Sequence, residues 1–178
     1  MGQIFDTKLV TDVESEVLTL TDVKAHLYIT HTNDDDYLTA LITRARKQIE
    51  NYCTIAIGSQ ERVWVSDLQY DIEYQIPYQP VISVDVASLK TDTATYTVKT
   101  ANTDYEVDGV QEKTFSPFSD GRWKVEYTTG YVVLPDDLKQ GWLAQILYLY
   151  ENRGDENKQG LSEITKDLVA PYRDLSWV

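Results

Sequence analysis

The sequence contains little cysteine, little histidine and no long hydrophobic run. Among its 178 residues there is one cysteine, Cys53, and there are two histidines. A single cysteine excludes an internal disulfide framework and fits a reducing compartment. Neither histidine lies at zinc-like spacing from the cysteine or from a second histidine pair, which argues against a zinc site. No apolar run approaches the ~20 residues that a membrane span needs. The first ten residues lack the pattern of a secretory signal.

Basic residues are also scarce relative to acidic ones. Lys and Arg number 16 against 29 Asp and Glu, which gives a net charge of −13. Each part of the chain is negative, with 5 basic and 9 acidic residues in 1–57, 6 and 12 in 58–130, and 5 and 8 in 131–178. Nucleic-acid binding depends on Lys and Arg that displace counterions from phosphates, so this composition argues against it. An acidic surface nevertheless suits a wall past which DNA must slide.

Apolar and aromatic residues are plentiful. The chain is 42% hydrophobic and carries 4 Trp, 13 Tyr and 3 Phe, which is enough to build a core in a chain of this length. The hydrophobic period is helical at both ends and close to two in the middle. We therefore expect an α+β fold in which the N- and C-terminal helices form a helical-bundle base with an inserted antiparallel β-sheet or small β-barrel. The expected domains are 1–57 (an N-terminal arm and helices), 58–130 (the β domain) and 131–178 (C-terminal helices and tail).

Two helices are expected in the first domain, after a loose arm that ends near residue 18. Residues 20–27 suggest a short helix with Thr21 as its N-cap. Asn33 is the expected N-cap of a longer helix, with three aspartates in its first turn. Apolar side chains then recur with helical period; they are Leu38, Leu41, Ile42, Ala45, Ile49 and Tyr52.

The middle of the chain reads as about five or six strands. β-Branched and aromatic residues alternate with polar ones in several short segments; these segments are 62–66, 81–86, 95–98, 105–107 and 123–127. Proline and glycine turns separate them, among them 116–117 and 120–121.

A strongly apolar helix dominates the last domain. It is expected to begin near 134–135, and between Trp142 and Tyr150 only Gln145 is neither apolar nor aromatic. A helix that is apolar on nearly every face must be covered on more than one side. Either it lies at the centre of the chain, or a second subunit covers it. A polar linker, 153–160, precedes a last helix expected over 162–170.

The sequence shows no catalytic constellation. Adjacent aspartates at 34–36 and 136–137 are typical of helix starts, where the helix dipole favours them, and Cys53 has no nearby histidine to activate it. Phosphate-binding glycine loops, nucleophile elbows and metal-binding helix motifs do not occur in the sequence. We therefore expect no enzymatic activity, no cofactor and no metal. The many tyrosines fit either half-buried sheet faces or a contact surface.

Three separated stretches, taken in order, resemble the head–tail connector (adaptor or head-completion) proteins of long-tailed double-stranded DNA bacteriophages. Residues 18–53 are similar to a short L-x-x-x-K-x-H-L helix, an acidic turn and a long helix ending in E-x-Y. Residues 130–153 are similar to a G-Y…P-x-x-L-K-x-A…L-x-x-x-Y-E-x-R helix, with Gly141 where the pattern has alanine. Residues 168–173 resemble a closing L-L-x-P-Y-R. Some branches of the family carry a β insert, which residues 58–130 match loosely.

This resemblance implies a structural role at the head–tail junction of a virion, for a protein made in the cytoplasm of a bacterial host. The chain would form a ring of about twelve subunits beneath the portal protein. The ring would extend the DNA channel, through which DNA passes without sequence-specific binding, and would provide a platform for a head-closure or tail protein.

The resemblance and the apolar helices together indicate two sets of contact residues. Packing within and between subunits is expected of Leu38, Leu41, Ile42, Ile49, Trp142, Ile146, Leu149 and Tyr150. Docking on the portal is expected, by analogy, of Leu168, Tyr172, Arg173, Trp177 and Val178. Trp177 could equally fold back onto its own subunit.

Two other functions stay open at this point. The tyrosine-rich β domain could recognise a peptide or a carbohydrate, with the helices as its support. A hydrolase that uses Asp and Glu is the least favoured, because the acidic residues are scattered at the ends of the expected elements.

Overall fold

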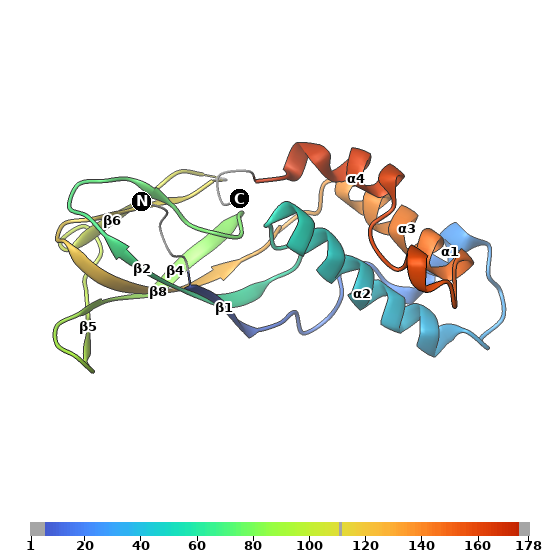
Figure 1. Cartoon of the computed structure of the whole chain (residues 1–178), viewed down its shortest axis with the longest axis horizontal. Coiled ribbons are helices and arrows are strands. Elements are labelled where there is room, and N and C mark those ends of the chain that lie inside the picture. The colour runs from blue at the N-terminus through green and yellow to red at the C-terminus, as the bar shows by residue number, and fades with distance from the viewer. Residues whose placement is uncertain (1–5, 111, 175–178) are drawn as a thin grey trace. The chain divides into compact units, whose positions relative to one another are not determined.

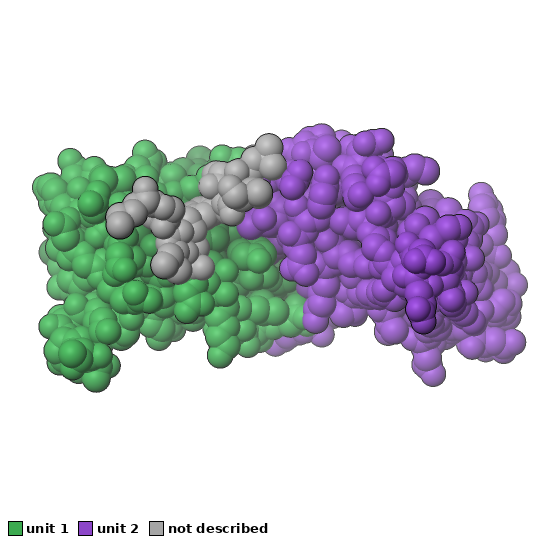
Figure 2. All heavy atoms as spheres, viewed as in Figure 1, with its two compact units in different colours: residues 1–13, 58–131 green, residues 14–57, 132–178 purple. Residues whose placement is uncertain are grey.

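The computed structural model describes residues 6–110 and 112–174, which form helices and antiparallel strands (Figure 1). The expected α+β class is confirmed. The chain divides into two compact units (Figure 2). We call residues 1–13 and 58–131 the sheet unit, and residues 14–57 and 132–178 the helical unit.

Two antiparallel sheets make up the sheet unit. One has the strand order β1-β2-β8-β4-β5 and the other the order β3-β7-β6. The strands of the first sheet, in that order, are Asp6–Thr11, Gln60–Leu68, Gly121–Thr129, Val81–Lys90 and Tyr96–Val98. Those of the second are Tyr74–Gln75, Thr114–Pro117 and Tyr105–Asp108. Both sheets have free edge strands in the described residues, so the unit contains open sheets rather than a closed barrel.

Aromatic rings fill the core of the sheet unit. Phe115 is fully buried, stacks on Tyr105 with ring centroids 4.9 Å apart, and meets Trp123 edge-on at 5.4 Å. Strand β2 alternates buried and more exposed side chains, and this period of two points Trp64 into the same core. Tyr74 and Tyr127 are buried there as well. Half of the tyrosines between residues 58 and 130 therefore serve the core rather than a recognition surface.

Two segments of the sheet unit differ from the expectation. Residues 6–11, expected in a loose arm, pair with β2 as its outer neighbour, with Thr7 opposite Trp64. An edge strand faces water along one side and needs no continuous apolar pattern, so its polar composition concealed it. Residues 116–117, expected to be a turn, lie in β7, where Pro117 is the last residue of the strand.

The helical unit contains four α-helices and two 3-10 turns in the described residues. The α-helices are α1 (Leu20–Leu27), α2 (Asp35–Cys53), α3 (Asp136–Glu151) and α4 (Glu163–Val169). The turns are η1 (Glu156–Lys158) and η2 (Ala170–Tyr172). Helix α3 contacts α1, α2 and α4, so helices from both ends of the sequence pack against it.

Both N-caps expected for α1 and α2 are wrong by one or two residues. Thr19, not Thr21, caps α1, in a reciprocal box in which the Asp22 backbone N–H donates to Thr19 and the Thr19 N–H donates to the Asp22 carboxylate. The N-cap position of α2 is Asp34 rather than Asn33, and its side chain makes no bond to its own helix.

Candidate interaction surface

The residues expected to pack within and between subunits lie mostly inside the helical unit. Seven of the eight are at most 3% exposed in the single chain; they are Leu38, Leu41, Ile42, Ile49, Trp142, Ile146 and Leu149. The indole N–H of Trp142 donates to the Ile42 carbonyl at 2.9 Å, which joins α3 to α2. These seven side chains of α2 and α3 are thus covered within the single chain.

Helix α2 carries three basic residues close together in the sequence, Arg44, Arg46 and Lys47, and its two arginines have separate partners in the fold. Arg46 is buried and donates to Glu16 and to Glu50, at 2.8 Å in each case. The second oxygen of Glu50 accepts from the Ile57 backbone N–H at 2.8 Å. Arg44 donates to the side chain and the carbonyl of Gln159. The two arginines therefore hold segments of the helical unit together and do not form a patch for phosphates.

Gln145, the polar exception in α3, is buried and is hydrogen-bonded through both its amide nitrogen and its amide oxygen. Its amide nitrogen donates to Gln48 and to the Gly160 carbonyl, both at 2.9 Å. Its oxygen accepts from the Ser162 N–H at 3.0 Å and from the Thr165 hydroxyl at 3.1 Å. One side chain thus connects α3 to α2, to the linker and to the start of α4.

Tyr150 and Arg153, which belong to the Y-E-x-R part of the resemblance, converge on the start of α2. The Tyr150 hydroxyl donates to Asp34 at 2.8 Å, and Arg153 donates to the same carboxylate at 3.0 Å. The bonds from Arg153 and then from Tyr150 lower the pKa of Asp34. Arg153 also lies over the Tyr37 ring, 3.8 Å from its centroid. This cluster fixes the end of α3 to the start of α2.

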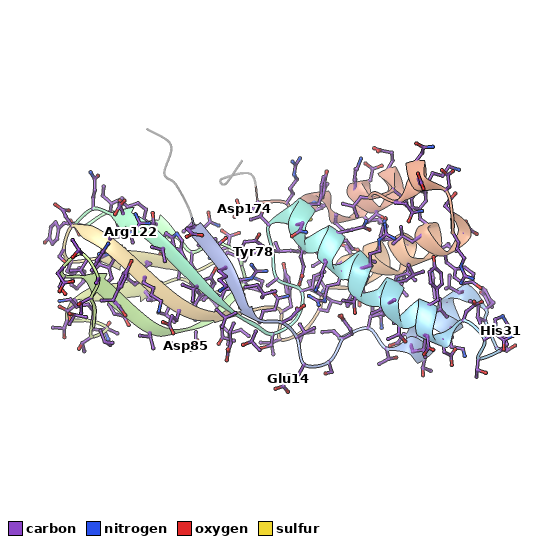
Figure 3. The ribbon with its side chains drawn as sticks, turned by 60° about the horizontal axis from the view of Figure 1, so that its bottom comes forward. Glu14, His31, Tyr78, Asp85, Arg122 and Asp174 are labelled. Atoms are coloured by element: carbon purple, nitrogen blue, oxygen red, sulfur yellow. The ribbon has the colours of Figure 1, made fainter. Side chains whose placement is uncertain are left out.

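The C-terminal segment is anchored on the helical unit as far as Asp174. The Asp174 N–H donates to the Cys53 carbonyl at 2.9 Å, beside the end of α2 (Figure 3). Arg173 lies over the Tyr52 ring at 4.7 Å. Tyr172 is half-buried. Trp177 and Val178, also expected at the portal, lie outside the described residues.

Gly141 allows α4 to lie close against α3. A Cβ on Gly141 would be 2.6 Å from Val169 Cγ1 and 3.6 Å from Leu168 Cβ. Val169 is fully buried, whereas Leu168 is half-exposed. The departure from alanine at residue 141 therefore has a packing reason.

An apolar groove of about 460 Å³ runs along the helical unit between α3 and α4. We call it the α3–α4 groove. Its floor consists of Ala144, Leu147, Tyr148, Ile164 and Leu168. Polar residues surround this floor; they are His26, Gln140, Glu151 and Ser162. Ile164 is 68% exposed, unlike the residues expected at subunit contacts, so the groove is open to a partner.

Sequence reasoning missed this groove as a site, although it singled out Leu168. The spacing of Ile164 and Leu168, four residues apart and each preceded by an acidic residue, was the available signal for the α4 side of the groove. The α3 side of the groove depends on how α3 and α4 pack together, and the sequence of one helix alone does not contain this information.

Metal-ligating groups and the thiol of Cys53 were the remaining candidates for chemistry in the described residues. The part of the chain that the structure describes contains no group of three or more His, Cys, Asp or Glu side chains placed to hold a metal ion. Burial raises the pKa of the Cys53 thiol to about 11, so the thiol stays protonated and a poor nucleophile at neutral pH. None of the described helices combines the length and hydropathy of a membrane span.

Solved structures share this fold over nearly the whole chain. A chain in the neck of an empty gene transfer agent (GTA) particle, computed with C6 symmetry, superposes with a TM-score of 0.78 at 18% identity. A chain in the virion of a native GTA particle gives 0.77 at 19% identity, and one in the neck of a native GTA particle, computed with C12 symmetry, gives 0.73 at 20%. In all three pairs, 97% of each chain is covered.

The sequence itself identifies the family. No curated protein matches the chain. The family model described as head completion protein matches residues 16–163, which span most of the helical unit and the strands β2 to β8. This match confirms the resemblance derived from the three sequence stretches. The chain belongs to the head completion protein family.

Proposed function

We propose that this chain is a structural component of the head–tail junction of a phage-like particle. In this role it assembles beneath the portal as a ring, extends the DNA channel and offers a platform for a head-closure or tail protein. The observation that carries the proposal is the family match over residues 16–163. The fold, shared at full length with chains of GTA necks and virions, supports it.

The proposal of a ring is supported by the symmetry of the similar particles. Two of the similar neck structures are computed with C6 and C12 symmetry, which fits several copies placed around one axis. A net charge of −13 per copy suits a channel wall that repels DNA and lets it slide.

Within this proposal the two units have different tasks. The helical unit, with its closed core, is the base of each subunit. Its C-terminal segment docks on the portal through Leu168, Tyr172 and Arg173 and through the residues that follow. Asp174 is held to α2 through the Cys53 carbonyl, so this docking segment is fixed to the helical unit as far as that residue.

The proposal is tested with the portal protein of the particle that encodes this chain. The purified chain is mixed with assembled portal, and negative-stain images are averaged around the portal axis. We expect an added ring on one end of the portal, and its loss when residues 175–178 are deleted. A portal that stays bare in the presence of excess full-length chain would contradict the proposal.

A further inference from the structure

The apolar floor of the α3–α4 groove is exposed, and on its α4 side it contains a regularly spaced pair of side chains, Ile164 and Leu168. Ile164 and Leu168 lie one turn apart on α4, and the buried Thr165 and Val169 follow each of them. The pair therefore lies beside the buried face of α4 rather than within it. Across the groove, Ala144, Leu147 and Tyr148 are half-exposed on α3. Such a strip fits the apolar face of an extended or helical peptide segment.

Carboxylates border this apolar floor. Glu163 and Asp167 directly precede Ile164 and Leu168 and are exposed, so they stand on the solvent side of the same strip. Glu151 lines the groove from the end of α3. Lys166 bonds Glu163 at 2.7 Å and offsets part of that charge. The border keeps an excess of negative charge, because Glu151 and Asp167 add to it.

We propose that the α3–α4 groove binds a segment of a different protein in which apolar side chains are flanked by Lys or Arg. The inference rests on the proposed function, since the head–tail junction is where such a partner is met. Apolar side chains of the segment cover Leu147, Ile164 and Leu168. Its cations lie against Glu151 and Asp167, where charge complementarity favours the right partner and speeds its approach.

The charges of the chain argue against a second copy as the occupant. Each of the three expected domains carries a net negative charge, which is −4 in 1–57, −6 in 58–130 and −3 in 131–178. At this groove a neighbouring copy would on average bring acidic residues toward the acidic border, so a cationic segment of another protein is the more favourable occupant. DNA is disfavoured for the same reason, because its phosphates would meet Glu151 and Asp167.

Photo-crosslinking in intact particles tests the inference. A photoreactive amino acid replaces Ile164, and a matched control replaces Val98 of β5, which is also 68% exposed. Both positions are exposed enough to accept the change without loss of the fold. We expect position 164 to crosslink to a peptide of another particle protein that contains apolar residues and Lys or Arg. We expect at least fivefold less of that product from position 98.

A charge variant tests the border separately. Glu151→Gln combined with Asp167→Asn, in the chain with the crosslinker at 164, is compared with Glu106→Gln combined with Asp108→Asn, two exposed carboxylates of β6. We expect the first pair to lower the crosslink yield roughly three- to tenfold and the second to leave it unchanged, as two exposed ion pairs would predict.

The possible results separate this inference from the proposed function. If particles contain no copy of the chain, the structural role at the junction fails. If the chain is present, a crosslink from position 164 to a second copy, to an acidic peptide or to DNA overturns the inference alone. A yield at 164 no greater than at 98, or one insensitive to the border charges, overturns it as well.

Discussion

At the scale of single residues, Gly141 decides how closely two helices of the helical unit approach. Glycine in a helix interior costs about 1 kcal/mol of stability relative to alanine. Here a Cβ would lie 2.6 Å from Val169 Cγ1, which is closer than two carbon atoms normally come. The β-branched side chain of Val169 has little freedom to turn away within its helix.

Gly141→Ala should therefore destabilise the chain, by about 1 kcal/mol, because overpacking at ~1–3 kcal/mol exceeds the gain in helix propensity. Chemical denaturation monitored by circular dichroism measures the difference. In a Val169→Ala background the same substitution should become stabilising, since the clashing methyl group is gone. An effect of the same sign in both backgrounds would contradict this packing.

Thr19 and Asp22 form the capping box of α1, and the bonds from Thr19 lower the pKa of Asp22. The Asp22 carboxylate therefore contributes stability above its unfolded pKa, near 3.9, and this contribution is lost as the pH falls through its lower folded pKa.

Asp22→Asn should lower the free energy of unfolding at pH 7, and the loss should be smaller near pH 2.5, because the carboxylate loses its charge as the pH falls. Urea titrations at the two pH values measure this, with Asp36→Asn, an exposed residue of α2, as the control. An equal loss at both pH values would show that the charge of Asp22 has no part in the cap.

At the scale of elements, the periodic segments could be predicted from the sequence and their partners could not. The apolar stripe from Leu38 to Ile49 defines the buried face of α2, and the apolar run from Trp142 marks α3. The cap of α1 was recoverable as well, because Thr19 has an acidic residue three positions later whereas Thr21 has Lys24.

Other features depend on tertiary contacts that no local pattern contains. Strand β1 is defined by its pairing with β2, and its own residues are mostly polar. The α3–α4 groove requires two helices separated by the linker to pack side by side. The sequence likewise could not tell whether α3 is covered by α1, α2 and α4 of the same chain or by a second subunit.

Gln145 shows how one polar side chain joins several elements. It is fully buried, and its four hydrogen bonds reach α2, the linker and α4. Gln145→Leu would remove these four hydrogen bonds and leave their partners unsatisfied. Each unsatisfied buried polar group lowers the free energy of unfolding by ~1–3 kcal/mol.

We therefore expect Gln145→Leu to destabilise the chain by about 3 kcal/mol, measured by thermal and urea denaturation. Gln140→Leu, an exposed position on the same helix, should change stability by less than about 0.5 kcal/mol. Similar effects from the two substitutions would contradict the connecting role of Gln145.

At the scale of the whole molecule, each unit closes its own hydrophobic core within one chain. Trp142, Ile146 and Leu149 are at most 1% exposed without a second subunit, and so are Trp64, Trp123 and Phe115 in the sheet unit. A chain whose cores close in this way does not need a second copy in order to fold, and its contacts with other chains are left to exposed residues.

The purified chain should accordingly be a folded monomer of 20.4 kDa at micromolar concentration, with the ring forming on the portal. Multi-angle light scattering measures the mass directly. A chain that is unfolded or aggregated at low concentration, and that folds only as a ring, would contradict a core closed within each subunit.

The central claim is that this chain occupies the neck of a particle, between the head and the next component. Electron cryomicroscopy of particles from the virus or gene transfer agent that encodes it tests this most directly. The account predicts density beneath the portal, repeated around the axis, into which the sheet unit and the helical unit both fit. A neck in which every density belongs to other proteins, in particles that stay intact when the gene is deleted, would contradict it.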